Sequence, residues 1–254
     1  MAILLSGDFH ADADNELQRI TKKNLVQRYT AELFDGIQYH IILGDGGFLW
    51  PGNENGDMRN YRELSRRPFP VLCVFGNHEP ALGRRDLPEA DIGIGEKVIV
   101  VHDKNPFVAY LKRGKEYLIE EHKFLVMGGA LSIDREYRRP NQSWWENEYW
   151  SRQETAELFE YLEKKNVFDF VLSHTGPGRI NEVLFDYLRM SQESKFYDEV
   201  AVLNDAVDKK IICRQWFCGH WHKDEFYQDK KLERSYQYLY KKTALIRGNE
   251  VIVL

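Results

Sequence analysis

The sequence predicts an α/β fold, and three observations support this prediction. Five short apolar runs, rich in Val, Ile, Leu and Phe, have the length and composition of buried strands. Stretches with apolar residues at helical spacing lie between these runs. A chain of 254 residues with 43% hydrophobic and 30% charged content can bury one sizeable core. We therefore expect a single domain over residues 1–254.

The five predicted strands each carry a polar residue at the carboxyl end. They are MAILLSGD (1–8), YHIILGD (39–45), PVLCVFGN (70–77), FDFVLSH (168–174) and QWFCGH (215–220). In open α/β sheets, ligands bind at the carboxyl ends of the strands. Four of the runs also contain a glycine that permits a sharp turn close to an ion, namely Gly7, Gly44, Gly76 and Gly219. We expect the five strand ends to converge on one rim.

Three stretches have the apolar spacing of helices that cover a sheet: 14–34, 151–165 and 194–209. The second opens with Ser151 and Glu154, the pattern of a capping box. The last twelve residues, TALIRGNEVIVL (243–254), have a turn signal between two apolar runs and predict a terminal hairpin. No internal repeat or low-complexity linker interrupts this pattern.

Charge and cysteine content exclude some classes of protein. The net charge is −5, whereas a nonspecific polyanion binder is usually basic, so nucleic acid is not indicated by net charge, although a local patch would still permit it. The three cysteines predict core thiols rather than disulfides: Cys73, Cys213 and Cys218. The sequence shows neither a leader pattern nor an apolar run that spans a bilayer. We expect no membrane association and a cytoplasmic location.

Five motifs at the strand ends supply donors for metal ions: GDFH (7–10), GD (44–45), GNHE (76–79), SH (173–174) and GHWH (219–222). Their carboxylate, carboxamide and imidazole groups, without a thiolate, suit Mn, Fe, Zn, Co or Ni in a catalytic site rather than a closed structural zinc site. The positive charge of two divalent ions exceeds the negative charge of two aspartates. Such a centre therefore attracts phosphate and hydroxide. The donor side chains are Asp8, His10, Asp45, Asn77, His174, His220 and His222.

The order of these motifs resembles the calcineurin-like metallophosphoesterases, in particular small bacterial and phage-type members. The resemblance implies a four-layer αββα sandwich, in which two mixed β-sheets are flanked by helices. It also implies two divalent transition-metal ions, with Mn as the first choice. The reaction it implies is hydrolysis of a phosphate ester by a hydroxide that bridges the two metals.

The resemblance assigns a role to each donor. Asp8, His10 and His222 correspond to ligands of the first metal, Asn77, His174 and His220 to ligands of the second, and Asp45 to the carboxylate that bridges both. His78 corresponds to the general acid that protonates the leaving oxygen, a task that suits an imidazole with an ordinary pKa of about 6.5. Glu79 is expected to orient His78.

The segment GGALSIDREYRRPNQSWWENEYWS (128–151) is the one visible source of substrate selection. It too resembles a stretch of the small bacterial and phage-type enzymes. In one interpretation its aromatic residues pack the loop onto the core. In the other the loop borders the pocket, where an arginine binds phosphate and an aromatic ring stacks on the leaving group. The candidate substrate-binding residues are Arg135, Arg138, Arg139, Trp144 and Trp145.

Two departures from the eukaryotic-type protein serine/threonine phosphatases narrow the substrate class. Phe48 and Phe75 stand where those enzymes usually carry a second acid after GD and an arginine before GNH. We therefore do not expect a protein phosphatase, and a phosphodiester becomes a serious candidate beside a phosphomonoester. Two alternatives stay open: a nuclease that acts on single-stranded nucleic acid, and a binding or scaffold protein whose chemistry has lapsed. Oligomeric state is left open.

Overall fold

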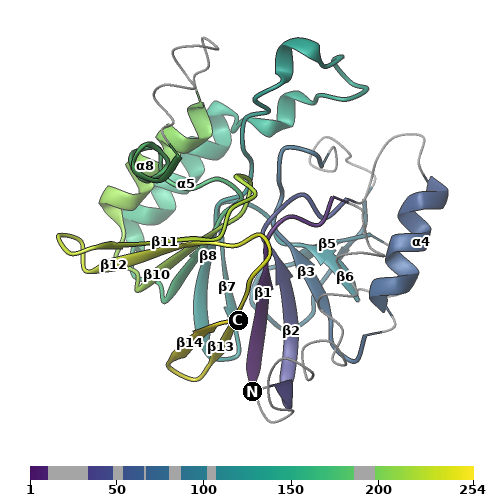
Figure 1. Cartoon of the computed structure of the whole chain (residues 1–254), viewed down its shortest axis with the longest axis horizontal. Helices are drawn as coiled ribbons and strands as arrows, with labels where there is room; N and C mark the ends of the chain where they lie inside the picture. Colours follow the sequence, from purple (N-terminus) through teal and green to yellow (C-terminus); the bar gives the residue numbers. More distant parts are fainter. Residues whose placement is uncertain (11–33, 48–53, 66, 80–86, 102–106, 186–197) are drawn as a thin grey trace.

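Two β-sheets packed face to face, with helices on their outer faces, form the protein (Figure 1). The computed structural model describes residues 1–10, 34–47, 54–65, 67–79, 87–101, 107–185 and 198–254. The four layers confirm the predicted αββα sandwich.

The larger sheet has eight strands in the order β14-β13-β1-β2-β3-β6-β5-β4. Neighbours from β1 to β6 run parallel, whereas β13, β14, β4 and β5 join antiparallel, so the sheet is mixed. The strands are β1 (Ala2–Ser6), β2 (Ile37–Ile42), β3 (Val71–Cys73), β4 (Glu89–Ala90), β5 (Val98–Val100), β6 (Val108–Tyr110), β13 (Thr243–Arg247) and β14 (Glu250–Val253).

The smaller sheet has six strands in the order β11-β12-β10-β9-β8-β7. Its central strands β12, β10, β9 and β8 are parallel, and one antiparallel strand pairs with each side of this group. The strands are β7 (Lys115–Ile119), β8 (His122–Val126), β9 (Phe170–Leu172), β10 (Gln215–Cys218), β11 (Glu225–Asp229) and β12 (Arg234–Tyr238).

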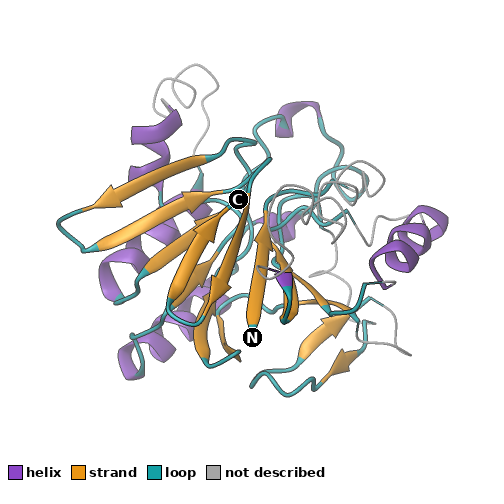
Figure 2. Cartoon of the chain, turned by 60° about the horizontal axis from the view of Figure 1, so that its bottom comes forward, coloured by secondary structure: helices purple, strands orange, loops and turns teal. Residues whose placement is uncertain are grey.

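Helices cover the outer face of each sheet (Figures 1 and 2). Helix α4 (Glu54–Ser65) lies on the larger sheet, and α5 (Arg152–Lys164), α6 (Gly178–Phe185) and α8 (Glu199–Lys210) lie on the smaller one. Two short 3₁₀ helices, η2 (Arg135–Tyr137) and η3 (Glu146–Glu148), belong to the segment drawn in teal at the top of Figure 1.

Three apolar layers hold these elements together. The central layer lies between the sheets and includes Leu5, Leu72, Phe124 and Phe217, all fully buried. The outer layers join each sheet to its helices, as where Leu158 of α5 packs beneath the smaller sheet. Because each buried side chain contributes on the order of 1.5–3 kcal/mol, this packing fixes the strand ends relative to one another.

Several predicted elements are confirmed. Ser151 caps α5 in a capping box with Glu154, and the terminal hairpin forms from β13 and β14. The third predicted helix begins at Glu199, behind an Asp198 cap, so it starts five residues later than the pattern indicated. The prediction for 14–34 falls almost wholly outside the described residues. The three cysteines are buried free thiols, as predicted.

None of the helices in the described part of the chain combines the length and the apolar character that crossing a bilayer requires.

Candidate metal centre

The carboxyl ends of five parallel strands meet at one edge of the sandwich. Three of them, β1, β2 and β3, are neighbours in the larger sheet, and β9 and β10 are neighbours in the smaller one. The turn after each strand carries donors, in the order Asp8 and His10, Asp45, Asn77, His174, and His220 and His222. The structure thus brings together all seven residues that the sequence proposed as ligands.

One group of donors consists of Asp8, His10 and His222, whose donor atoms all lie within 4.8 Å of one another. The Nε2 atoms of the two histidines are 2.8 Å apart. Both oxygens of Asp8 accept the backbone N–H of His220 at 3.0 Å, so the carboxylate is fixed. Two imidazoles and a held carboxylate are a donor set that binds a divalent transition metal.

Asp45 lies at the middle of the cluster. Its Oδ2 atom is 3.3 Å from Nε2 of His174 and 3.8 Å from Nε2 of His10. The Nδ1 atom of His174 is 2.7 Å from the carbonyl oxygen of Leu43, so Nε2 is the nitrogen that faces the centre. There it lies 3.0 Å from Oδ1 of Asn77. The ring of His220 lies 5.0 Å from that of His174, centroid to centroid. Asp45 therefore lies beside residues of both groups.

The centre is buried on one side and open on the other. Asp8, Asp45, Asn77 and His174 are buried, whereas His10 is exposed. A structural metal site is closed, so this half-open arrangement is that of a site reached by a substrate.

The two buried carboxylates of the centre need positive charge nearby. Burial raises the pKa of Asp8 to about 6. Burial also acts to raise the pKa of Asp45, but His174 and its neighbours outweigh this effect and lower it below its usual value. Burial acts to lower the pKa of His174, yet Asp45 and Asp8 raise it to about 10. Buried carboxylates are stable only when compensated, and bound cations supply such compensation. The donors therefore fit divalent metal ions.

Backbone strain gathers at the same place. Four of the donors have positive φ angles although none is glycine: His10 (48°), Asp45 (50°), His220 (70°) and His222 (51°). Such conformations cost on the order of 1–3 kcal/mol each and persist only where the surroundings enforce them. Motif glycines make room beside them, since a Cβ on Gly76 would lie 2.1 Å from Oδ1 of Asp45. The loops are shaped to aim donors inward at a cost in stability.

Glu79 accepts hydrogen bonds from the backbone of two loops at the centre. Its carboxylate accepts the backbone N–H groups of Gly76 at 2.6 Å, Asp45 at 3.2 Å and Gly47 at 3.4 Å. Burial raises its pKa to about 8. The side chain thus contacts the loops after β2 and β3. A buried carboxylate needs hydrogen-bond donors, and the backbone N–H groups of these loops supply them. The hydrogen bonds of Glu79 thus join these two loops, and its expected role in orienting His78 stays a prediction.

His78 lies at the open side of the centre, with Nε2 at 3.8 Å from Oδ2 of Asp45. Its ring also meets the guanidinium of Arg138, whose Nη2 is 3.1 Å from Nε2 and whose Nη1 is 3.4 Å from Nδ1. Burial lowers the pKa of His78 to about 4. The charge of Asp45 opposes this shift, and the charge of Arg138 adds to it. The ordinary value assumed from the sequence is therefore wrong for this imidazole.

The three candidate arginines of the 128–151 segment make different contacts. Arg138 contacts His78 and is held by Asp134, which accepts its Nε–H at 2.6 Å. Arg135 instead stacks over Trp144, at 4.3 Å from the ring centroid, and donates to the hydroxyl of Tyr149 at 2.8 Å. Arg139 is exposed. Only Arg138 has a contact that joins it to the centre.

The two candidate tryptophans also differ, because Trp145 is buried and Trp144 is half-buried. The loop is anchored from below by Arg113, which donates to both carboxylate oxygens of Glu154 at 2.9 Å and to the carbonyl of Tyr149 at 2.8 Å. Packing thus accounts for Trp145, whereas Trp144 keeps an accessible side. The packing interpretation therefore applies to Trp145, and the substrate-binding interpretation stays a prediction for Trp144.

Two residues that the sequence reasoning missed lie behind Asn77. Ser132 accepts the Nδ2–H of Asn77 at 3.0 Å and donates its own hydroxyl to Glu148 at 2.7 Å. Burial raises the pKa of Glu148 to about 7, while its hydrogen bonds with Ser132 oppose the shift. Their only signal in the sequence was membership of the arginine- and tryptophan-rich segment.

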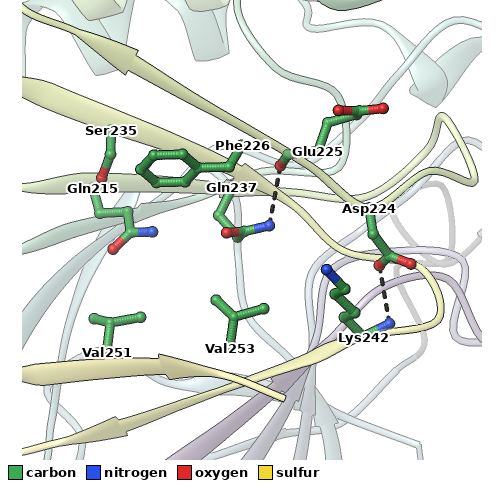
Figure 3. Close-up of a pocket in the computed structure, with 9 residues that line it drawn as sticks. All are labelled: Gln215, Asp224, Glu225, Phe226, Ser235, Gln237, Lys242, Val251 and Val253. Atoms are coloured by element: carbon green, nitrogen blue, oxygen red, sulfur yellow. Dashed lines mark hydrogen bonds between the residues drawn. The ribbon is translucent and has the colours of Figure 1, made fainter.

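Two cavities lined by described residues contain none of the seven donors. One of about 470 Å³ lies between the sheets where β11 and β12 approach β14 (Figure 3). Its Gln237 donates to the carbonyl of Glu225, and its Asp224 accepts the backbone N–H of Lys242. These polar groups stabilise local turns and strands, and none belongs to the seven donors.

We predict that Gly76→Ala weakens metal binding because the new Cβ occupies the place of the Asp45 carboxylate. Elemental analysis after saturation with Mn²⁺ measures the effect. Gly248→Ala is the control: nothing lies within 4 Å of the added Cβ, so only a backbone cost of roughly 1–2 kcal/mol applies, from the positive φ of Gly248. Equal metal content in both variants would contradict the prediction.

The fold is shared with proteins of known structure. No curated protein sequence matches the chain. Among solved structures, phosphopantetheinyl hydrolase from Mycobacterium tuberculosis superimposes with a TM-score of 0.53 at 12% identity, over 94% of this chain and 90% of that one. A second crystal structure gives a TM-score of 0.58 at 10% identity, over 100% and 98%. A protein serine/threonine phosphatase from Saccharomyces cerevisiae gives 0.41 at 12% identity, over 100% and 79%.

At such identities the first two superpositions show a shared fold and nothing more. The family is shown by sequence, because the model of the calcineurin-like phosphoesterases matches residues 1–224 and so includes all five motifs. The chain therefore belongs to the calcineurin-like phosphoesterases and is a hydrolase of phosphate esters.

Proposed function

We propose that the protein hydrolyses a phosphomonoester or phosphodiester at a centre of two divalent transition-metal ions, with residues 1–254 acting as one domain. The observation that carries this proposal is the convergence of seven donors on one half-open site, with Asp45 between two groups. When bound, the ions would supply Lewis acidity that activates water and neutralises charge on the phosphate. Mn is our first choice, because oxygen and imidazole donors without thiolate suit it.

Our ligand assignment follows the family resemblance, and the close approach of Asp8, His10 and His222 supports its first group. We assign Asp8, His10 and His222 to one ion and Asn77, His174 and His220 to the other. Asp45 is assigned to both, since its carboxylate lies within 4 Å of imidazoles from each group. Both aspartates are buried, so bound cations would add to the compensation that His174 and backbone N–H groups give their charges.

Arg138 and His78 lie where a bound ester would meet the protein. A guanidinium binds phosphate oxygens through two parallel N–H donors, and Arg138 offers its Nη atoms beside the imidazole of His78. We assign Arg138 to phosphate binding and His78 to protonation of the leaving oxygen. Negative charge of the bound phosphate would raise the pKa of His78 from about 4 toward neutrality, as a general acid requires.

The two alternatives draw less support from these contacts. A nuclease needs a run of cationic and aromatic side chains along a strand of nucleic acid. Here Arg135 is stacked on Trp144, and Trp145 is buried. These side chains therefore do not line such a groove. A lapsed scaffold would lack ligands, whereas all seven are present and gathered. A small phosphate ester is therefore our preferred substrate class.

Metal content provides the first test. Purified protein saturated with Mn²⁺ should bind about two ions per chain, and Asp45→Ala should weaken both sites because the carboxylate is shared. Elemental analysis and calorimetric titration measure this. A chain that never binds more than one ion would refute the dinuclear centre.

The assignment of His78 predicts a dependence on the leaving group. His78→Ala should keep both metals yet lose roughly 10²–10⁴-fold in kcat for esters with poor leaving groups. The loss should shrink for 4-nitrophenyl esters, whose leaving oxygen needs little protonation. If the loss is equal across a leaving-group series, or if the variant loses metal, His78 is not the general acid.

Arg138→Ala should raise KM for phosphate esters while metal content and melting temperature change little, because a group that binds substrate affects KM. Arg139→Ala, at the neighbouring and exposed position, is the matched control and should behave as wild type. Kinetics of both variants on a 4-nitrophenyl monoester and diester measure the effect. Unchanged KM in Arg138→Ala would show that the phosphate is held elsewhere.

A further inference from the structure

To act as a metal ligand, Asn77 has to point the oxygen of its carboxamide toward the centre. Only Oδ1 can bind a metal ion, because the amide nitrogen carries two hydrogens and offers no lone pair. In the structure Oδ1 is 3.0 Å from Nε2 of His174, on the side of the centre. The nitrogen Nδ2 points away and is 3.0 Å from the hydroxyl of Ser132. Some contact must therefore distinguish this orientation from the one rotated by about 180°.

Glu148 sets the direction of the hydrogen bonds behind Asn77. One of its carboxylate oxygens accepts the hydroxyl proton of Ser132 at 2.7 Å, and the other accepts the backbone N–H of Ser132 at 3.0 Å. Above the pKa of about 7 that burial gives Glu148, its ionised carboxylate only accepts, so the single proton of the hydroxyl is committed to Glu148. The oxygen of Ser132 is then left to accept, and the group that can donate to it is the NH₂ of Asn77.

Burial makes this direction costly to reverse. Asn77, Ser132 and Glu148 are 4%, 1% and 2% exposed, so water does not readily replace a lost partner. A rotated amide would place Oδ1 against the oxygen of Ser132, two acceptors without a proton between them. Leaving buried polar groups unpaired costs about 1–3 kcal/mol each. The pair therefore holds the amide oxygen toward the centre.

We propose that Ser132 and Glu148 are positioning residues that orient Asn77 as a metal ligand and so link metal binding to the 128–151 segment. The proposal rests on the proposed function, since it takes Asn77 as a ligand. Glu148 lies in η3, and the same segment supplies Arg138 beside His78. One segment would then both present a phosphate-binding arginine and hold a ligand of the second metal ion.

Glu148→Gln is the decisive variant because it keeps the size of the side chain. The amide of glutamine can donate to Ser132, whose proton is then free to turn toward Asn77 and favour the rotated carboxamide. Calorimetric titration of metal-free protein with Mn²⁺ should show one of two sites weakened by about 10- to 100-fold, the usual effect of losing an outer partner of a ligand. Ser132→Ala should weaken the same site.

Two further variants separate orientation from general stability. Glu146→Gln, on the same 3₁₀ helix but exposed, removes an equal charge and should bind both ions as wild type does. Asn77→Asp gives a side chain with two equivalent oxygens, so orientation no longer matters. In that background Glu148→Gln should cause little further loss of affinity, a coupling that a merely structural residue would not produce.

The outcomes are distinguishable. If wild type binds fewer than two ions, the proposed function fails and this inference fails with it. If wild type binds two ions and Glu148→Gln also binds both with unchanged affinity, only the inference is overturned, even if the melting temperature of the metal-free variant falls. Should Ser132→Ala not fold, Glu148→Gln alone decides the result.

Discussion

Two buried aspartates at the ends of adjacent parallel strands are the constraint on which the rest of the structure depends. Asp8 and Asp45 are each 2% exposed, and burial of a carboxylate is costly unless positive charge or hydrogen-bond donors compensate it. The backbone N–H of His220 reaches Asp8, and that of His78 reaches Asp45 at 3.0 Å. Imidazoles surround both. The loops after the strands are arranged to provide this compensation.

Strain and support in these loops follow from that constraint. Four donors, one of them Asp45, have positive φ angles in the loops around the centre, and Glu79 ties the loops after β2 and β3 together through backbone N–H groups. The 128–151 segment adds a second support through Ser132. A site held from several directions keeps its donors aimed at a common point, as a metal-dependent hydrolase of phosphate esters requires.

The sequence predicted the strands, the gathered donors and the capped helix because each depends on local pattern: apolar runs, strand-end polarity and Ser151 with Glu154. It could not predict side-chain contacts between positions that neither a motif nor the convergence of the strand ends brings together. The contact of Arg138 with His78 joins positions 60 residues apart, and the lowered pKa of His78 results from burial that no motif reveals. The hydrogen bonds of Glu79 and Glu148 were missed for the same reason: their partners are defined only by the fold.

The donors come from both sheets, and this has a consequence for folding. Strands β1, β2 and β3 belong to one sheet and β9 and β10 to the other, so neither sheet alone holds a complete centre. Ions that bind only the assembled chain stabilise it by mass action. Bound metal ions would then hold the two sheets together. The stability of the packing between the sheets would rise and fall with the concentration of free metal around the protein.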